Sequence, residues 1–149
     1  MRTEATGRAL AYLADHQVMT LATDGPMGLW AAAVFYVSEG FQLVFLSAGH
    51  TRHAQNMAAS SVVAATIQED YDDWTAIKGI QLEGTVRLLS GEERDTAIGL
   101  YARKFAFLAQ PVSAVEKALA GVNWYRLLPE RLYFIDNSRG FGHRDEIDL

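Results

Sequence analysis

Residues 43–57, "LVFLSAGHTRHAQNM", predict a strand, a tight turn and a helix in direct succession. The first turn of this helix carries Thr51, Arg52 and His53, and His50 stands just before it. The same stretch contains no acidic residue. A cation at a helix start opposes the helix macrodipole at a cost of about 0.3–1 kcal/mol, so this pattern requires an explanation.

A bound anion would reverse that cost. Free backbone N–H groups at a helix start, a threonine hydroxyl and an arginine together suit a phosphate group. The residues also allow a plainer interpretation, in which Arg52 and His53 are solvated surface residues and Thr51 only caps the helix. Spacing alone leaves both interpretations open.

Two further strands surround this unit. Residues 29–37, "LWAAAVFYV", are apolar at every position, which predicts a strand covered on both faces. Its three successive alanines leave room for a flat ligand or for close contact between strands or subunits. Residues 79–89, "GIQLEGTVRLL", alternate between apolar and polar side chains, which predicts a long half-buried strand with Gly84 at a bend or close approach.

The rest of the pattern predicts one mixed domain without repeats. Helices are expected at 3–16, 51–59, 91–106 and 113–120, and strands at 18–23, 29–38, 41–47, 62–67, 79–89, 123–128 and 131–136. Strands at such close spacing, with hairpin signals between them, favour a mainly β (α+β) fold in which helices pack outside an antiparallel barrel.

Composition narrows the classes of function. The net charge of -5 disfavours a nucleic-acid or membrane-surface partner, because polyanions require a basic face. The absence of cysteine removes disulfides, iron–sulfur clusters and thiolate chemistry. His50 and His53 are three residues apart without a third ligand by motif, so no metal site is expected. The N-terminus lacks a signal-peptide pattern and no apolar run approaches ~20 residues, so the expected location is the cytoplasm.

Three segments together give the chain a family resemblance. They are "FLSAGHTRHAQNMAASSVVAA" (45–65), "GIQLEGTVRLLSGEE" (79–93) and "NWYRLLPERLYFIDN" (123–137). In order and spacing they resemble the pyridoxamine-phosphate-oxidase-like, FMN-binding split-barrel family, in a bacterial branch distinct from the true oxidase. The resemblance implies a single domain over 1–149, an antiparallel split β-barrel of about six strands with peripheral helices. It also implies a homodimer that binds FMN in grooves between its subunits.

Carried over by position, the resemblance assigns cofactor-binding residues on two strands and one helix start. These residues are Ala33, Val34, Leu46, Ser47, Thr51, Arg52 and His53. Ser47 and the three helix-start residues would surround the FMN phosphate, and the backbone of Ala33 and Val34 would face the flavin ring. Because His53 stands where the family has lysine, and imidazole titrates near pH ~6.5, FMN affinity is expected to rise as the solution becomes more acidic than pH ~8.

The chain departs from the true oxidase on the substrate side. Oxidase positions that contact cofactor or substrate are occupied here by Ala31, Tyr36, Ile135, Phe141, His143 and Asp145. The histidine of the oxidase's Arg-x-His pair is kept, but the cations that hold a phosphorylated substrate are absent. Since charge-assisted hydrogen bonds are the strong ones, this loss argues against pyridoxamine phosphate as the substrate. Tyr36 and His143 remain as substrate-side candidates.

Three functions are compatible with this resemblance. The first is a flavin-dependent oxidoreductase that acts on a small molecule, in which FMN carries the electron chemistry and the protein positions it. This suits a sequence without an evident acid–base constellation. The second is a non-enzymatic flavin-binding or sensing protein. The third is a split barrel that uses a deazaflavin or haem, and fold alone does not decide among the three.

Overall fold

The computed structural model describes residues 3–109 and 119–149 of the chain. Within these ranges the α-helices are α1 (Glu4–Asp15), α2 (Arg52–Ala59) and α3 (Gly91–Lys104). The strands there are β1 (Val18–Thr23), β2 (Trp30–Phe35), β3 (Val37–Glu39), β4 (Gln42–Ala48), β5 (Val62–Gln68), β6 (Lys78–Leu88), β7 (Val122–Asp136) and β8 (Arg144–Glu146). Short 3-10 helices are η1 (Trp74–Ala76), η2 (Ala106–Ala109) and η3 (Asn137–Arg139). The helix predicted over 113–120 falls mainly outside the described residues.

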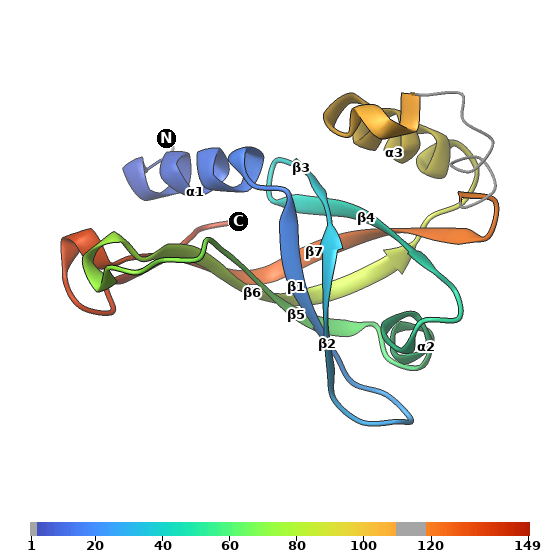
Figure 1. Ribbon diagram of the computed structural model, residues 1–149, viewed down its shortest axis with the longest axis horizontal. Helices are drawn as coiled ribbons and strands as arrows, with labels where there is room; N and C mark the ends of the chain where they lie inside the picture. The colour runs from blue at the N-terminus through green and yellow to red at the C-terminus, as the bar shows by residue number, and fades with distance from the viewer. Residues whose placement is uncertain (1–2, 110–118) are drawn as a thin grey trace.

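The strands of the described residues form one antiparallel sheet. Their order is β2-β1-β5-β6-β7-β4-β3, and β8 pairs with β7. The sheet curls into a half-barrel, with α1 and α3 on one side of the view and α2 at the opposite rim (Figure 1). This architecture confirms the predicted mainly β fold, a split barrel with peripheral helices.

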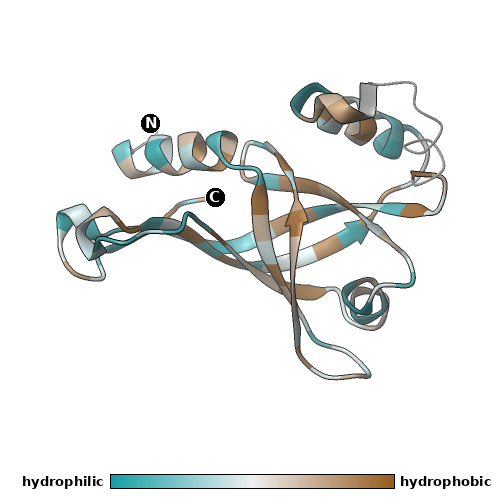
Figure 2. Ribbon diagram, viewed as in Figure 1, coloured by the Kyte–Doolittle hydropathy of each residue, from teal (hydrophilic) through white to brown (hydrophobic). Residues whose placement is uncertain are grey.

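The inside of the curl holds the main hydrophobic core. Alternation along each strand turns one set of side chains inward, including the buried Leu21, Ile80 and Phe134. Helix α1 covers this core with Ala9 and Leu13, and a smaller apolar cluster packs between α3 and β4. Apolar colour runs along β1 and β2, whereas α2 and α3 carry hydrophilic stretches (Figure 2).

Tyr36 divides the strand predicted over 29–38 into two. Strand β2 ends before Tyr36 and β3 begins after it, and the Tyr36 N–H donates to the Gln17 carbonyl at 2.9 Å. The chain passes here from one end of the sheet to the other, because β2 pairs with β1 and β3 pairs with β4. The prediction of one continuous strand is therefore wrong, since a uniformly apolar run carries no signal for the change of partner.

The two strands predicted at 123–128 and 131–136 are one continuous strand, β7. Pro129 cannot donate a ladder hydrogen bond, and the β6–β7 register shifts opposite it, between Glu83 and Gly84. A Cβ on Gly84 would lie only 2.8 Å from the Pro129 Cα. Glycine therefore permits the two backbones to meet, and the close approach predicted at Gly84 is confirmed.

The C-terminal segment forms a hairpin that the sequence pattern did not predict. Strand β8 runs antiparallel to β7 with Arg144 opposite Ile135, and the Asp136 N–H donates to the His143 carbonyl at 3.0 Å. This strand is only three residues long, below the length at which alternation gives a usable signal. The hairpin fixes the positions of His143 and Arg144 beside the sheet.

Candidate functional site

Strand β4 leads into α2 through a short turn, which confirms the strand, turn and helix predicted for 43–57. Thr51 is the N-cap, since its Oγ1 accepts a hydrogen bond from the Ala54 N–H at 3.2 Å. This cap satisfies one donor of the first turn. Helix geometry leaves the N–H groups of Arg52 and His53 without intrahelical partners.

The imidazole of His53 lies inside the turn and not on the surface. Its Nε2 is 2.6 Å from Ser47 Oγ and 3.4 Å from Thr51 Oγ1. Ser47 and His53 are only 5% and 9% exposed. Burial lowers the pKa of His53, because desolvation disfavours the charged imidazolium. The interpretation of His53 as a solvated surface residue is therefore wrong.

Arg52 connects α2 to the loop between β1 and β2. Its guanidinium carbon lies 4.3 Å from the centroid of the Trp30 ring. Its Nη2 donates to the Met27 carbonyl at 2.6 Å and to the Leu29 carbonyl at 3.3 Å. Its Nε is buried and has no hydrogen-bond partner among the described residues. One edge of the guanidinium thus holds the loop while a donor remains for another group.

Asn56 holds the same loop and was not predicted as a site residue. Its Nδ2 donates to Thr23 Oγ1 at 3.2 Å and to the Gly28 carbonyl at 3.1 Å. A Cβ on Gly25 would lie 2.7 Å from the Asn56 Cα, so the loop packs directly against the helix. An asparagine inside a predicted helix, where it is a poor helix former, was the signal available in the sequence.

Strand β2 forms an edge of the sheet in the described part of the chain. It pairs there with β1 alone, so the far edge of the Ala33 and Val34 backbone has no strand partner. Trp30 and Phe35 are 46% and 47% exposed. The prediction that both faces of this strand are covered is therefore wrong for a single subunit. An edge strand offers free N–H and C=O groups on its far side.

Two predicted site residues point into the cores. Leu46 lies opposite Trp124 in the sheet register and packs with the cluster beneath α3, away from Ser47. Tyr36 is fully buried, and its hydroxyl donates to the Leu13 carbonyl at 2.6 Å. Burial raises the pKa of Tyr36. The prediction of Tyr36 as a substrate-side residue is therefore wrong for this structure, because its side chain has no exposed surface and its hydroxyl is bonded to Leu13.

His143 lies on the C-terminal hairpin, which is drawn in red at the opposite end of the sheet from α2 (Figure 1). Its Nε2 is 3.2 Å from Asp145 Oδ2. One subunit therefore does not bring His143 together with the cluster of Ser47, Thr51 and His53. That cluster is called the α2 cluster below.

The described residues offer neither a metal-binding cluster nor a membrane-spanning helix. They contain no group of three or more histidine, aspartate or glutamate side chains placed to hold a metal ion. Their helices include none that combines the length and the apolar character needed to cross a membrane.

A curled antiparallel sheet with peripheral helices and a polar strand–turn–helix corner defines a split-barrel protein. The family model described as pyridoxamine 5'-phosphate oxidase matches residues 5–136. The chain belongs to this family, as its three sequence segments predicted.

Known proteins resemble the chain over most of its length. A UPF0306 protein from Enterobacter sp. (strain 638) is 35% identical over 135 residues, which cover 89% of each chain. A solved heme binding protein from Mycobacterium smegmatis has a TM-score of 0.79 at 22% identity, and the match covers 98% of this chain but 58% of that protein. The heme storage protein HutZ from Vibrio cholerae has a TM-score of 0.71 at 19% identity, covering 89% and 94%. At these identities the two solved structures show a shared fold alone.

Proposed function

We propose that this chain binds FMN and acts as a flavin-dependent oxidoreductase on a small molecule. The observation that carries the proposal is the α2 cluster, in which the hydroxyls of Ser47 and Thr51 lie 2.6 and 3.4 Å from His53 Nε2 at the start of a helix. The first N–H groups of that helix have no intrahelical partners. No acidic residue occurs from 43 to 68. Such a site suits a phosphate dianion, because both the N–H groups and the helix dipole favour negative charge.

The residues present fit the phosphate end of FMN. The Nε of Arg52 lacks a partner among the described residues, but it is buried, so an anion would reach it only after the Arg52 side chain moves. Ser47, Arg52 and the N–H groups of Arg52 and His53 would hold the phosphate, and the free backbone edge of β2 would lie beside the ring. The Thr51 hydroxyl donates to the Ala48 carbonyl at 2.9 Å, so it would position the helix start. When bound, FMN supplies the hydride and electron chemistry. The protein residues bind and orient it.

The outer face of the sheet supports a homodimer. This face is the side of β2, β1 and β5 that points away from the main core. It carries Ala31, Ala33, Phe35, Val18, Thr20, Ala22, Val62, Ala64 and Thr66. None of these residues is charged, and their small side chains would permit close approach of a second copy. A second copy would also cover the exposed β2 edge.

The proposed substrate is not pyridoxamine phosphate. Ala31 and Phe141 carry no charge at positions where the oxidase uses arginine, and Tyr36, at its lysine position, lies in the core. A phosphate ester bound without these cations would lose its strongest hydrogen bonds. The substrate is therefore a different small molecule.

Binding of FMN and of riboflavin to purified protein, followed by flavin fluorescence quenching, tests the cofactor proposal. We expect riboflavin to bind at least about tenfold more weakly, because it lacks the phosphate. Replacing both Arg52 and His53 by alanine is expected to reduce this preference, whereas Arg131→Ala, remote on β7, keeps it. Equal binding of the two flavins, or an unchanged double variant that is folded, would refute the assignment. Oxidation of NADH or NADPH by the loaded protein then separates an oxidoreductase from a binding protein.

Haem is a second candidate cofactor. Solved proteins named for haem binding share the fold, and His143 supplies an imidazole that Asp145 orients at 3.2 Å. Its sequence neighbours Gly142 and Arg144 line a pocket. A Soret band on addition of haem that is lost in His143→Ala would support haem, whereas flavin bands in the purified protein would support FMN.

A further inference from the structure

The loop between β1 and β2, residues 24–29, is held to the body of the protein mainly by polar contacts. The side chains at its tip remain in solvent, since Met27 and Leu29 are 62% and 77% exposed. Arg52 Nη2 donates to the carbonyls of these two residues at 2.6 and 3.3 Å, and Asn56 Nδ2 donates to the Gly28 carbonyl at 3.1 Å. A segment with few buried apolar contacts opens easily. The position of this loop therefore depends on two side chains of α2.

The contact between the loop and α2 contains polar atoms that it does not satisfy. Three buried side-chain nitrogen or oxygen atoms of the described residues have no hydrogen-bond partner there, and two of them are Arg52 Nε and Asn56 Oδ1. A buried polar atom without a partner costs free energy, which a competing arrangement can recover. The contact is thus less stable than its hydrogen bonds alone would suggest.

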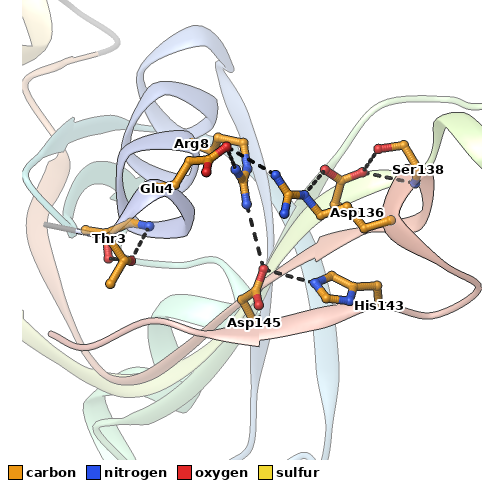
Figure 3. Close-up of polar contacts among 9 residues, drawn as sticks. Thr3, Glu4, Arg8, Asp136, Ser138, His143 and Asp145 are labelled. Carbon is orange, nitrogen blue, oxygen red and sulfur yellow. Dashed lines mark hydrogen bonds and ion pairs between the residues drawn. The ribbon is translucent and has the colours of Figure 1, made fainter.

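The charge of Arg52 is bonded to neutral groups. No carboxylate lies within 4.0 Å of its guanidinium among the described residues, and the guanidinium carbon lies 4.3 Å from the centroid of the Trp30 ring. Arg8, which carries the third unpartnered atom, differs, because it lies 2.7 Å from Glu4 and 3.9 Å from Asp145 (Figure 3). A guanidinium binds an anion more strongly than a carbonyl. An anion can therefore compete for Arg52, whereas Arg8 is already paired.

The guanidinium of Arg52 cannot hold the loop and grip an anion with two nitrogens at once. A bidentate pair uses two neighbouring guanidinium nitrogens, so it includes either Nη2 or Nε. In Arg52 the Nη2 is bonded to the loop and the Nε is buried. Two nitrogens become available together only when the side chain leaves the loop.

We propose that Arg52 is a latch that couples the start of α2 to the β1–β2 loop. An anion bound at the helix start draws the guanidinium away from the loop carbonyls and from the Trp30 ring, and the tip of the loop is released. Asn56 keeps its bond to Gly28, so the loop stays attached at that residue. The loop leads directly into β2, so occupancy of the anion site changes the start of that strand. The identity of the anion as the FMN phosphate rests on the proposed function, whereas the latch requires only an anion.

Fluorine NMR of the full chain labelled with fluorotryptophan tests the latch. Inorganic phosphate is the probe, and sodium chloride at equal ionic strength is the blank. Trp30→Phe identifies the resonance of Trp30 among the three tryptophans. We expect phosphate to shift this resonance and to leave those of Trp74 and Trp124 in place. Cleavage of the loop by chymotrypsin should become several-fold faster with phosphate, because the loop is then open more often.

Arg52→Lys separates the latch from the charge. Lysine keeps a cation at the helix start, but it lacks the planar guanidinium that stacks on a ring and bonds two carbonyls. We therefore expect fast cleavage of the loop in the free Arg52→Lys protein, with no further response to phosphate. Arg131→Gln, on β7 and remote from the loop, is the matched control and should respond to phosphate as the wild type does.

An unmoved Trp30 resonance with phosphate, or slow cleavage of the loop in folded Arg52→Lys, overturns the inference. FMN binding is measured in parallel by fluorescence quenching, so that the two proposals fail separately. A protein that binds FMN while phosphate leaves Trp30 in place rejects the latch alone. A Trp30 response to phosphate in a protein that ignores FMN supports the latch and rejects the flavin function.

Discussion

Substitution of His53 by glutamine is expected to abolish a pH dependence of FMN affinity. The buried ring of His53 lies 2.6 Å from Ser47 Oγ, and its burial lowers its pKa in the free protein. A phosphate dianion at the helix start would favour the imidazolium and raise that pKa in the complex. At a pH between these two pKa values, FMN binding is then accompanied by uptake of a proton. Affinity consequently rises as the pH falls.

The expected size of the effect follows from the burial of His53. A hydrogen bond to a charged group contributes about 1.5–3 kcal/mol, and a ring that is 9% exposed is little screened by solvent. This free energy corresponds to about 10- to 150-fold in affinity. Uptake of one proton limits the slope to about tenfold per pH unit. Below pH ~6 the phosphate itself takes up a proton, so the informative window lies above that value.

The assay is titration of FMN by fluorescence quenching at several pH values between ~8 and ~6.5, with riboflavin as the ligand that lacks phosphate. Wild-type affinity for FMN should rise toward acid, His53→Gln should give a flat profile, and His53→Lys should bind tightly without a slope. A flat wild-type profile, or the same slope in His53→Gln, would show that His53 does not contact the phosphate.

Four further predictions concern the free energy of unfolding, measured by chemical denaturation. Gly84→Ala should lower the free energy of unfolding by about 3 kcal/mol, because the new Cβ would lie 2.8 Å from the Pro129 Cα. Gly99→Ala, in α3 with open space around it, should raise that free energy by about 1 kcal/mol. Tyr36→Phe should cost about 1–2 kcal/mol through loss of a buried hydrogen bond and leave FMN affinity unchanged. Because the pKa of His53 is lowered in the native state, the unfolded chain takes up a proton there first as the pH falls below ~6.5. The free energy of unfolding should therefore decrease toward acid by at most about 1.4 kcal/mol per pH unit. The decrease should be smaller in His53→Gln.

Local signals in the sequence were sufficient for the strand, turn and helix at 43–57 and for the long strand with Gly84. Alternation, capping and a glycine at a close approach act over a few residues, so they can be read without knowledge of the fold. The β6–β7 register shifts at Gly84, opposite Pro129. This shift accommodates a proline inside the strand, so β7 continues where the sequence predicted two strands.

Tyr36 and β2 could not be predicted because their surroundings come from distant parts of the chain. Tyr36 enters the core through its contact with Leu13 of α1, which no local pattern encodes. The apolar run of β2 predicted two covered faces, but one subunit leaves Trp30 and Phe35 half exposed. A hydrophobic pattern indicates that a strand face is covered, but it does not indicate whether the same chain or a second copy covers that face.

Arg52 can occupy the start of α2 without any anion. Its stacking on Trp30 contributes about 0.5–1 kcal/mol, which offsets the cost of about 0.3–1 kcal/mol for a cation at that place. Its bonds to the loop carbonyls add to this stabilisation. The charge of Arg52 therefore gives less support for a phosphate than the sequence suggested. Burial lowers the pKa of His53 in the free protein, so its charge would respond to an anion at the helix start, which is why His53 is the sharper probe of the cofactor.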